Sequence, residues 1–191
     1  MEAFEHLVKV ALEHERYVVS SNMKFPVRKR TKKRQREEYQ EHGYEVDLVG
    51  ARRDSLILAS VKSFFGSSGV SRQGFEGVAD SNKKTHFKLY ALFNDETVRQ
   101  GVVKAASERF GYSPSLISLW LCVGKFRSGH QEAITKHLEH GIRPFCNEVI
   151  VMGLHDIMRG ITERSRSRTY LNDPVVMTIK ALEEMKLIKQ F

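Results

Sequence analysis

The chain has 191 residues and a formal net charge of +8, and 41% of its residues are hydrophobic and 28% are charged. These values are typical of a globular protein, and the length suits one α/β domain with a hydrophobic core. No run of about 18 apolar residues predicts a membrane span, so we expect no membrane partner.

The N-terminus and the cysteines indicate an intracellular, cytoplasmic protein. Glu2 and Glu5 lie where a signal peptide would be basic and then apolar. Cys122 and Cys146 lack metal-type spacing and are expected to be small core residues in a reducing compartment.

A helix over 4–12 and a short strand over 17–19 are the first predicted elements, and a strongly basic segment follows them. Its basic residues account for all but one of the excess positive charges: Arg28, Lys29, Arg30, Lys32, Lys33, Arg34 and Arg36. A block of like charges is commonly solvated, whereas Lys and Arg also neutralise phosphates. We expect it to contact a nucleic-acid backbone without reading base sequence, because no aromatic residues are interleaved. A nuclear-localisation signal is an alternative interpretation.

A β-hairpin is predicted after the basic segment. Its apolar-rich arms, 43–50 and 56–63, flank a polar tip near Arg53 and Asp54. Because the arms fold back on each other at this tip, residues near the start of the first arm approach the end of the second.

Side chains alternate faces along a strand, and this alternation groups the polar residues of the hairpin. Glu45 and Asp47 share one face of the first arm, and Ser60 and Lys62 share one face of the second. The fold of the hairpin brings Asp47 close to Ser60, with Lys62 one step beyond. A buried carboxylate or amine is costly unless it is paired or bound to a cation, so we expect a functional site here.

The hairpin resembles that of the PD-(D/E)XK nuclease superfamily, which includes many restriction endonucleases and the archaeal Holliday-junction resolvases. In that pattern an Asp begins the hairpin, and an acidic residue, any residue and a Lys close it. Here Asp47 is followed after twelve residues by Ser60-Val61-Lys62, so Ser60 replaces the second acid. Resolvase-like members also place a metal-binding Glu in the first helix, and Glu5 is similar in position and spacing.

The resemblance implies an α/β, restriction-endonuclease-like core of helix, three-strand meander, helix and strand, with a mixed central sheet flanked by helices. We expect one nuclease-like domain, 1–191, with its core in 1–125 and a C-terminal helical extension in 126–191. Resolvases act as dimers, so the resemblance also implies a homodimer.

Mg²⁺ or Mn²⁺ is the cofactor that the resemblance implies. It assigns the ion to Asp47, with the carbonyl of Val61 as a further ligand, and it gives Lys62 the task of orienting or deprotonating the attacking water. Ser60 is a weaker ligand than a carboxylate, so another acid must replace the missing one or the site is disabled. Glu5 is the first candidate substitute and Glu45 is the second.

The remaining sequence predicts a Gly/Ser-rich loop over 63–74, placed to touch a DNA backbone, and then the outer elements of the domain. These are a helix capped by Asn94 and ended by Gly111, a strand over 116–123, a polar helix over 129–140 ended by Gly141, a strand over 149–152, and a last helix that starts at Asp173-Pro174. His130, His137 and His140 on the polar helix are a zinc candidate, although solvent-facing histidines are far commoner.

Three functions remain open from the sequence. The first is a metal-dependent DNA endonuclease that hydrolyses phosphodiester bonds of branched or otherwise structured DNA. The second is a catalytically inactive DNA-binding module with the nuclease fold. The third is a basic RNA-binding protein of unrelated fold, in which Asp47 and Lys62 form an ordinary ion pair.

Overall fold

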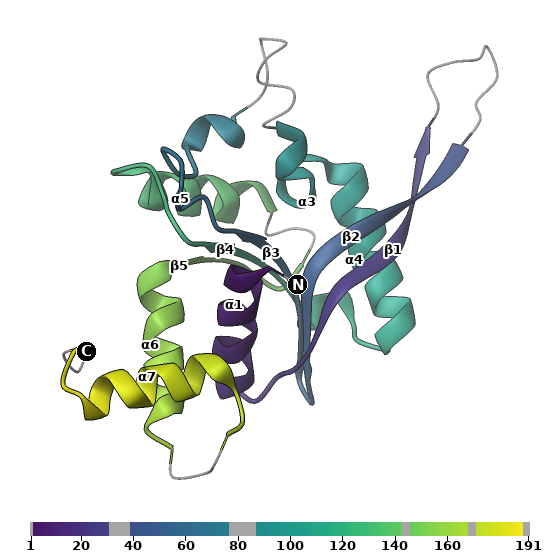
Figure 1. Cartoon of the computed structure of the whole chain (residues 1–191). Coiled ribbons are helices and arrows are strands. Elements are labelled where there is room, and N and C mark those ends of the chain that lie inside the picture. The colour runs from purple at the N-terminus through teal and green to yellow at the C-terminus, as the bar shows by residue number, and fades with distance from the viewer. Residues whose placement is uncertain (1, 31–38, 77–86, 143–145, 168–170, 189–191) are drawn as a thin grey trace.

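The fold is described from a computed structural model that covers residues 2–30, 39–76, 87–142, 146–167 and 171–188. Its centre is a five-stranded mixed sheet in the order β1-β2-β3-β4-β5 (Figure 1). The strands are β1 (Val18–Arg30), β2 (Tyr39–Arg52), β3 (Ser55–Lys62), β4 (Ile117–Val123) and β5 (Val149–Gly153). The first three strands are antiparallel, whereas β4 and β5 run parallel to β3.

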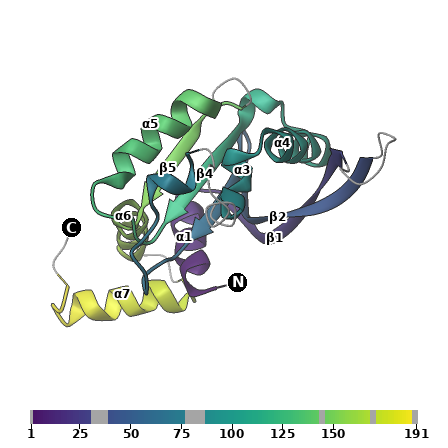
Figure 2. The same ribbon diagram turned by 90° about the horizontal axis from the view of Figure 1, so that it is seen from above.

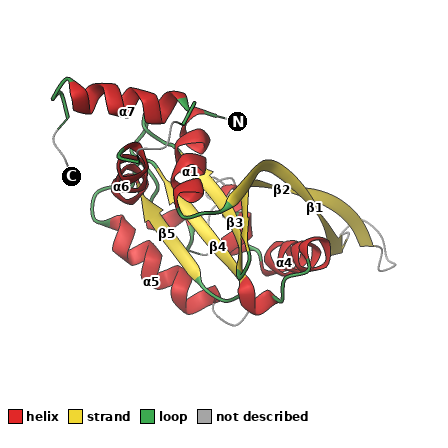
Figure 3. Cartoon of the chain, turned by 90° about the horizontal axis from the view of Figure 1, so that it is seen from below, coloured by secondary structure: helices red, strands yellow, loops and turns green. Residues whose placement is uncertain are grey.

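Helices cover both faces of this sheet (Figure 2). On one face lie α1 (Ala3–His14), α6 (Leu154–Ser165) and α7 (Pro174–Glu184), with α7 lying across α1 and α6 (Figure 3). On the other face lie α3 (Ala91–Asn94), α4 (Glu96–Phe110) and α5 (His130–Ile142), with the short 3₁₀ turns η1 (Arg72–Gly74) and η2 (Pro114–Leu116) in the connections. The predicted α/β class with a mixed sheet flanked by helices is confirmed.

The alternation of β3 places its side chains in two separate cores. Leu56 and Leu58 pack with α4 and α5, whereas Ile57, Ala59 and Val61 pack with α1, α6 and α7. The next strand, β4, is buried along its whole length. A parallel strand covered by helices on both faces is expected to be continuously apolar, which is why the apolar run over 116–123 predicted it.

Two predicted helix boundaries need correction. Asp95, and not Asn94, is the N-cap of α4, since its carboxylate accepts a hydrogen bond from the Val98 N–H. Asn94 instead donates its side-chain amide to two main-chain carbonyls, those of Gly74 and Phe87. The helix α5 continues through Gly141 to Ile142, so Gly141 does not end it.

The other predicted caps are present. Gly111 ends α4 in a left-handed conformation with φ 77°, and the Asp173 carboxylate accepts from the first N–H groups of α7.

The first strand is much longer than the sequence predicted, because β1 runs from Val18 to Arg30 instead of ending at Val19. It pairs with β2 along this whole length, whereas β2 pairs with β3 only from Leu48 to Arg52. The outer part of β1 and β2 is therefore a two-stranded ribbon that leaves the sheet (Figure 1). Residues 126–191, expected to form a helical extension, supply β5 to the sheet as well as α5, α6 and α7.

The helices among the described residues are too short or too polar to span a lipid bilayer.

Candidate functional site

The candidate site lies where β2 separates from β3. The last paired residues of the two strands are Leu48 and Ala59, so Asp47 lies opposite Ser60, as the sequence predicted. Beyond this point the Val61 N–H donates to Asp47 Oδ2 at 2.6 Å. The carboxylate therefore replaces the main-chain partner that β2 no longer offers, and this ties Asp47 to the end of β3.

Two side chains complete the contacts of this carboxylate. Ser60 Oγ donates to Asp47 Oδ2 at 3.1 Å, and Lys62 Nζ lies 3.4 Å from the same oxygen. Asp47 and Lys62 are about four-fifths buried, with side-chain exposures of 21% and 20%. Within the described residues, all hydrogen bonds to Asp47 end on Oδ2. The other oxygen, Oδ1, keeps its lone pairs for a further ligand.

A pocket of about 380 Å³ opens beside this pair. Its lining brings the first turn of α1 next to the ends of β2 and β3, and it consists of Glu2, Glu5, Asp47, Val61, Lys62, Ser63 and Phe64. The ring of Phe65 meets that of Phe4 edge to face at 5.3 Å, which fixes the start of α1 against the loop after β3. The predicted residues Glu5, Asp47, Val61 and Lys62 thus meet in one pocket.

Glu5 also has a structural role that the sequence analysis missed. Its Oε2 accepts a hydrogen bond at 3.0 Å from the N–H of Glu2, the N-cap of α1. An acid three residues after the N-cap is the signature that reveals such a contact. The contact anchors the Glu5 side chain at the pocket, and Glu2 adds a second carboxylate from the same turn.

Glu45 is not brought to the pocket. Its exposed carboxylate accepts from Asn22 Nδ2 at 3.2 Å and lies 3.8 Å from Lys24 Nζ. The simple alternation predicted for β2 fails at Asp47, because Val46 packs on the α4 side of the sheet and Leu48 on the α1 side.

Asn22 explains this change of face. It is the β1 residue opposite Asp47, and it has a left-handed φ of 54°. Asn is among the few residues that tolerate this conformation. The local distortion lets the ribbon turn away from β3 and carries Glu45 with it.

The structure describes only part of the basic segment. Arg28 lies over the Tyr39 ring at 4.8 Å, Lys29 pairs with Asp95 at 2.8 Å, and Arg30 is exposed at the end of β1. Four more residues of the predicted nucleic-acid surface lie outside the described residues: Lys32, Lys33, Arg34 and Arg36. Lys29 is thus committed to the N-cap of α4.

The Lys29–Asp95 pair has a measurable consequence for stability. Burial alone would raise the pKa of Asp95, but hydrogen bonds from Lys29 and from the Val98 N–H outweigh it and lower the pKa. A lowered carboxyl pKa stabilises the fold above the unfolded-state value, and this contribution is lost as the pH falls through the folded-state value.

We expect Asp95→Ala to lower the free energy of unfolding by about 1–2 kcal/mol at pH 7, the usual worth of an N-cap. The difference from wild type should shrink below the ordinary carboxyl pKa of 3.8. Urea denaturation at pH 7 and at a pH below 3.8 measures this difference in the free energy of unfolding. Asp54→Ala is the control, because Asp54 is also paired with a basic side chain, Arg52, but is 72% exposed. Equal losses in the two variants would contradict the prediction.

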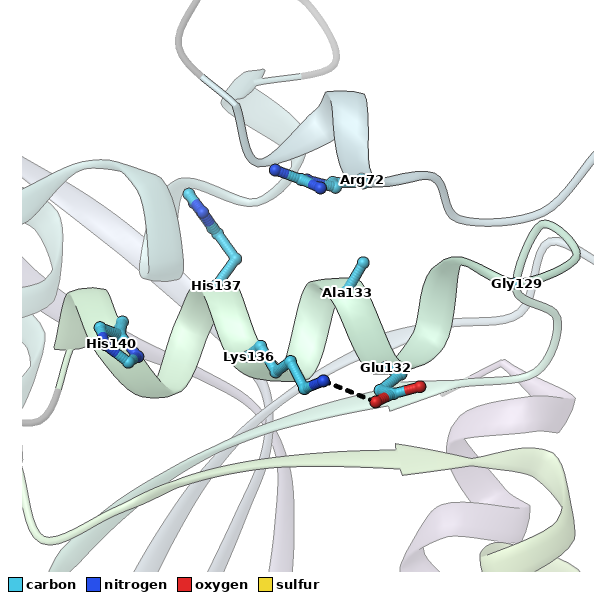
Figure 4. A pocket seen from close by; sticks show the side chains of 7 residues that line it. All are labelled: Arg72, Gly129, Glu132, Ala133, Lys136, His137 and His140. Atoms are coloured by element: carbon cyan, nitrogen blue, oxygen red, sulfur yellow. Dashed lines mark hydrogen bonds and ion pairs between the residues drawn. The ribbon is translucent and has the colours of Figure 1, made fainter.

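A second pocket, of about 480 Å³, lies over α5 (Figure 4). Its charges are compensated, since Lys136 pairs with Glu132 at 2.7 Å and Arg72 pairs with Glu76. The His137 ring rises toward η1, where its Nε2 lies 3.1 Å from the Phe75 carbonyl oxygen.

The candidate histidines of α5, which were expected to be solvent-facing more often than metal-binding, are not arranged as a zinc site in the described part of the chain. His130 Nδ1 accepts from the Arg72 N–H at 3.1 Å, so a backbone group already occupies this ring nitrogen. No group of three or more His, Cys, Asp or Glu side chains among the described residues is arranged to hold a metal ion.

Cys122 lies beside Val61 in the parallel pairing of β3 and β4. Burial, and to a lesser extent the charge of Asp47, raises the pKa of this thiol to about 12. It is therefore a protonated core residue and takes no part in the chemistry of the pocket.

The donors in the first pocket suit a hard divalent cation. Mg²⁺ is commonly held by one or two carboxylates and retains water and substrate phosphate as its other ligands. Asp47 and Glu5 supply two carboxylates from different elements, and Ser60 supplies a neutral hydroxyl that donates to Asp47.

A scan against protein-family models gives no match for the chain, and no curated protein matches its sequence.

Proposed function

We propose that the chain is a metal-dependent DNA endonuclease of the PD-(D/E)XK type that hydrolyses phosphodiester bonds of branched or otherwise structured DNA. The observation that carries the proposal is the meeting of Asp47, Lys62 and Glu5 in one pocket. The order of the main elements adds support. It runs from α1 through the antiparallel strands β1 to β3 and on to α4 and β4, which is the order of the restriction-endonuclease-like core.

Asp47 and Glu5 are the residues that would hold Mg²⁺ or Mn²⁺, together with the main-chain carbonyl of Val61. A bound ion would supply Lewis-acid stabilisation of the charge on the phosphoryl oxygens. Asp47 is suited to this task because Val61, Ser60 and Lys62 fix its Oδ2 and leave its Oδ1 for a ligand.

Lys62 is the residue that would act on the attacking water. Its ammonium is held beside Asp47 at the pocket lining, and it has three donor hydrogens, of which the carboxylate takes one. The others can orient a water against phosphorus or stabilise negative charge that develops in the transition state.

A catalytically inactive DNA-binding module is the second candidate, and Ser60 favours it. The hydroxyl donates to Asp47, where a carboxylate would instead add a second negative charge. Metal dependence separates the two candidates, since an inactive module should bind DNA equally well with and without Mg²⁺.

The test of the proposed function is cleavage of labelled linear, single-stranded and four-way-junction DNA by the wild-type chain. We expect cutting with Mg²⁺ or Mn²⁺, none in excess chelator, and a preference for the junction. Metal-independent binding without cutting on any DNA would replace the endonuclease by the inactive module. Preference for RNA in binding competition would favour the third function, a basic RNA-binding protein.

A further inference from the structure

The loops after β3 and β4 are joined into one unit, here called the strap, which consists of residues 63–70 and 124–127. Val70 and Phe126 form a parallel β-bridge. The Val70 N–H donates to the Lys125 carbonyl, and the Arg127 N–H donates to the Val70 carbonyl, both at 2.9 Å. The two loops therefore act as a short extension of the sheet.

The strap is fixed against the proposed active site. The Gly124 N–H donates to the carbonyl of Lys62 at 2.9 Å. A Cβ at Gly124 would lie 2.5 Å from the Ser63 carbonyl oxygen and 2.8 Å from the Phe65 ring, so only glycine permits this approach. Lys125 follows Gly124 directly, so this hydrogen bond holds Lys125 close to Lys62.

The same close packing recurs at the other end of the strap. Gly69 has a φ of 89°, and a Cβ there would lie 2.7–2.9 Å from the main chain of residues 125–127. This backbone conformation and this spacing both require glycine. The exposed side chains of the strap are consequently presented from a rigid backbone.

Lys125 and Arg127 differ from most basic residues of the protein. Both are exposed, and neither makes an ion pair with a carboxylate among the described residues. Among the described residues, the one hydrogen bond of Lys125 Nζ goes to the Ser67 carbonyl at 2.7 Å. Most other described cations are paired with an acid, including Lys24, Lys29, Arg72, Lys136, Arg159, Arg164 and Arg166.

A C-terminal basic cluster consists of Arg159, Arg164 and Arg166. These arginines form ion pairs within the protein and are therefore less suited to bind phosphate. Arg164 reaches across to Glu13 of α1 at 3.1 Å and is only 16% exposed, so it holds α6 against α1. Arg166 lies 3.7 Å from Glu183 of α7. These cations of the C-terminal cluster are therefore compensated, whereas Lys125 and Arg127 of the strap have no carboxylate partner among the described residues.

We propose that the strap is a phosphate-binding surface that holds the DNA backbone next to the scissile bond. Lys125 and Arg127 supply the charge, and the exposed hydroxyl of Ser68 supplies a neutral donor, whereas the Ser67 hydroxyl already donates to the Phe64 carbonyl. The proposal rests on the proposed function, because the pocket beside Lys62 defines where the scissile phosphate lies. Contacts of this kind are independent of base sequence and strongly dependent on salt.

The test is the salt dependence of binding to a labelled four-way junction in chelator, where no cutting is expected. For Lys125→Gln/Arg127→Gln, the slope of log K against log salt should be shallower than that of wild type by about 1.8, since each lost phosphate contact removes about 0.9. The matched control is Lys104→Gln/Arg109→Gln, which removes the same two residue types from α4.

Arg109, at the end of α4, lies toward the start of β3, the end of that strand opposite to Lys62. Tyr112, just after α4, donates its hydroxyl to the Arg52 carbonyl at the β2–β3 turn, so the end of α4 is distant from Lys62. The control slope should equal that of wild type. An unchanged slope in the strap variant, or an equal drop in the control, would overturn the proposal, as would absence of DNA binding by wild type.

The experiments can reject the strap proposal and the endonuclease proposal independently. A wild-type chain that binds junctions with the expected slope difference, but does not cut with Mg²⁺, retains the strap and loses the endonuclease. If the chain cuts DNA but the strap variant shows no slope difference, the endonuclease proposal stands and the strap proposal is rejected.

Discussion

Replacement of Lys62 by methionine is expected to lower the single-turnover rate of DNA cleavage about 100- to 1000-fold, the loss typical of removing one preorganised donor from a transition state. Methionine keeps the apolar stem and removes the ammonium beside Asp47. The water is then no longer oriented, and the developing charge loses a cation. Cleavage of the junction substrate at saturating Mg²⁺ measures the change.

The fold should survive this substitution. In the variant Asp47 keeps the Val61 N–H and the Ser60 hydroxyl as donors. The pocket also opens to water, so the free carboxylate can be solvated. Thermal unfolding should therefore change by only a few degrees, which separates a catalytic loss from a folding loss.

Lys9→Met is the matched control for Lys62→Met. Lys9 lies 3.8 Å from Glu13 on α1 and is 30% exposed, so it is another partly buried lysine beside a carboxylate. Its replacement should leave the cleavage rate unchanged. If Lys62→Met behaved like this control, Lys62 and Asp47 would be an ordinary ion pair, and the nuclease proposal would lose its central residue.

The hairpin and its register were predictable from the sequence because they follow from local rules. A polar tip at Arg53 and Asp54 between two apolar arms is sufficient to set the register that places Asp47 opposite Ser60, although the predicted alternation of β2 fails at Asp47 itself. The same holds for the buried strand β4 and for the glycine that ends α4. Each of these features is encoded within a few consecutive residues.

Features that depend on contacts between distant segments were not predictable in this way. The outer part of β1 has mostly exposed side chains, and only Phe25 and Val27 are buried, so its pairing with β2 and the packing of these two residues on α4 define it. The divergence of β2 from β3 depends on a left-handed Asn22 in the partner strand. This divergence removes Glu45 from the site and leaves the Val61 N–H for Asp47.

The strap could not be predicted from the sequence, because it too depends on contacts between distant segments. A Gly/Ser-rich loop after a strand predicts only a connection, and nothing near residue 66 indicates which segment will lie beside it. The parallel crossover from β3 to β4 brings Gly124 and Lys125 to that loop from about sixty residues away. Lys125, which belongs to no recognisable sequence motif, thereby becomes part of a surface near the pocket.

Ser60→Glu is expected to make the stability of the protein depend on divalent metal. The Ser60 side chain is buried and donates to Asp47, with 7% of the residue exposed. A glutamate there would remove this donor and place a second negative charge beside the first. Without metal, we expect the free energy of unfolding to fall by about 1–3 kcal/mol, the cost of a buried polar group without a partner.

Mg²⁺ should reverse this loss in the variant. A cation that binds only the folded state stabilises it by about 2.7 kcal/mol at one hundred times its dissociation constant. The carboxylate introduced at position 60 adds a third donor to those of Asp47 and Glu5, which the wild-type chain already has. Thermal unfolding in chelator and in Mg²⁺ measures this difference without depending on any cleavage.

Ser60→Gln is the control that isolates charge from size. Glutamine has the same shape as glutamate but adds no charge, so Mg²⁺ should raise its unfolding temperature no more than that of wild type. A larger rise in Ser60→Glu than in Ser60→Gln, with faster cutting than wild type, would mean that Ser60 weakens a site whose other residues are in place. Equal behaviour of the two variants would mean that the carboxylates do not converge on a cation, and the pocket would then be a structural ion pair.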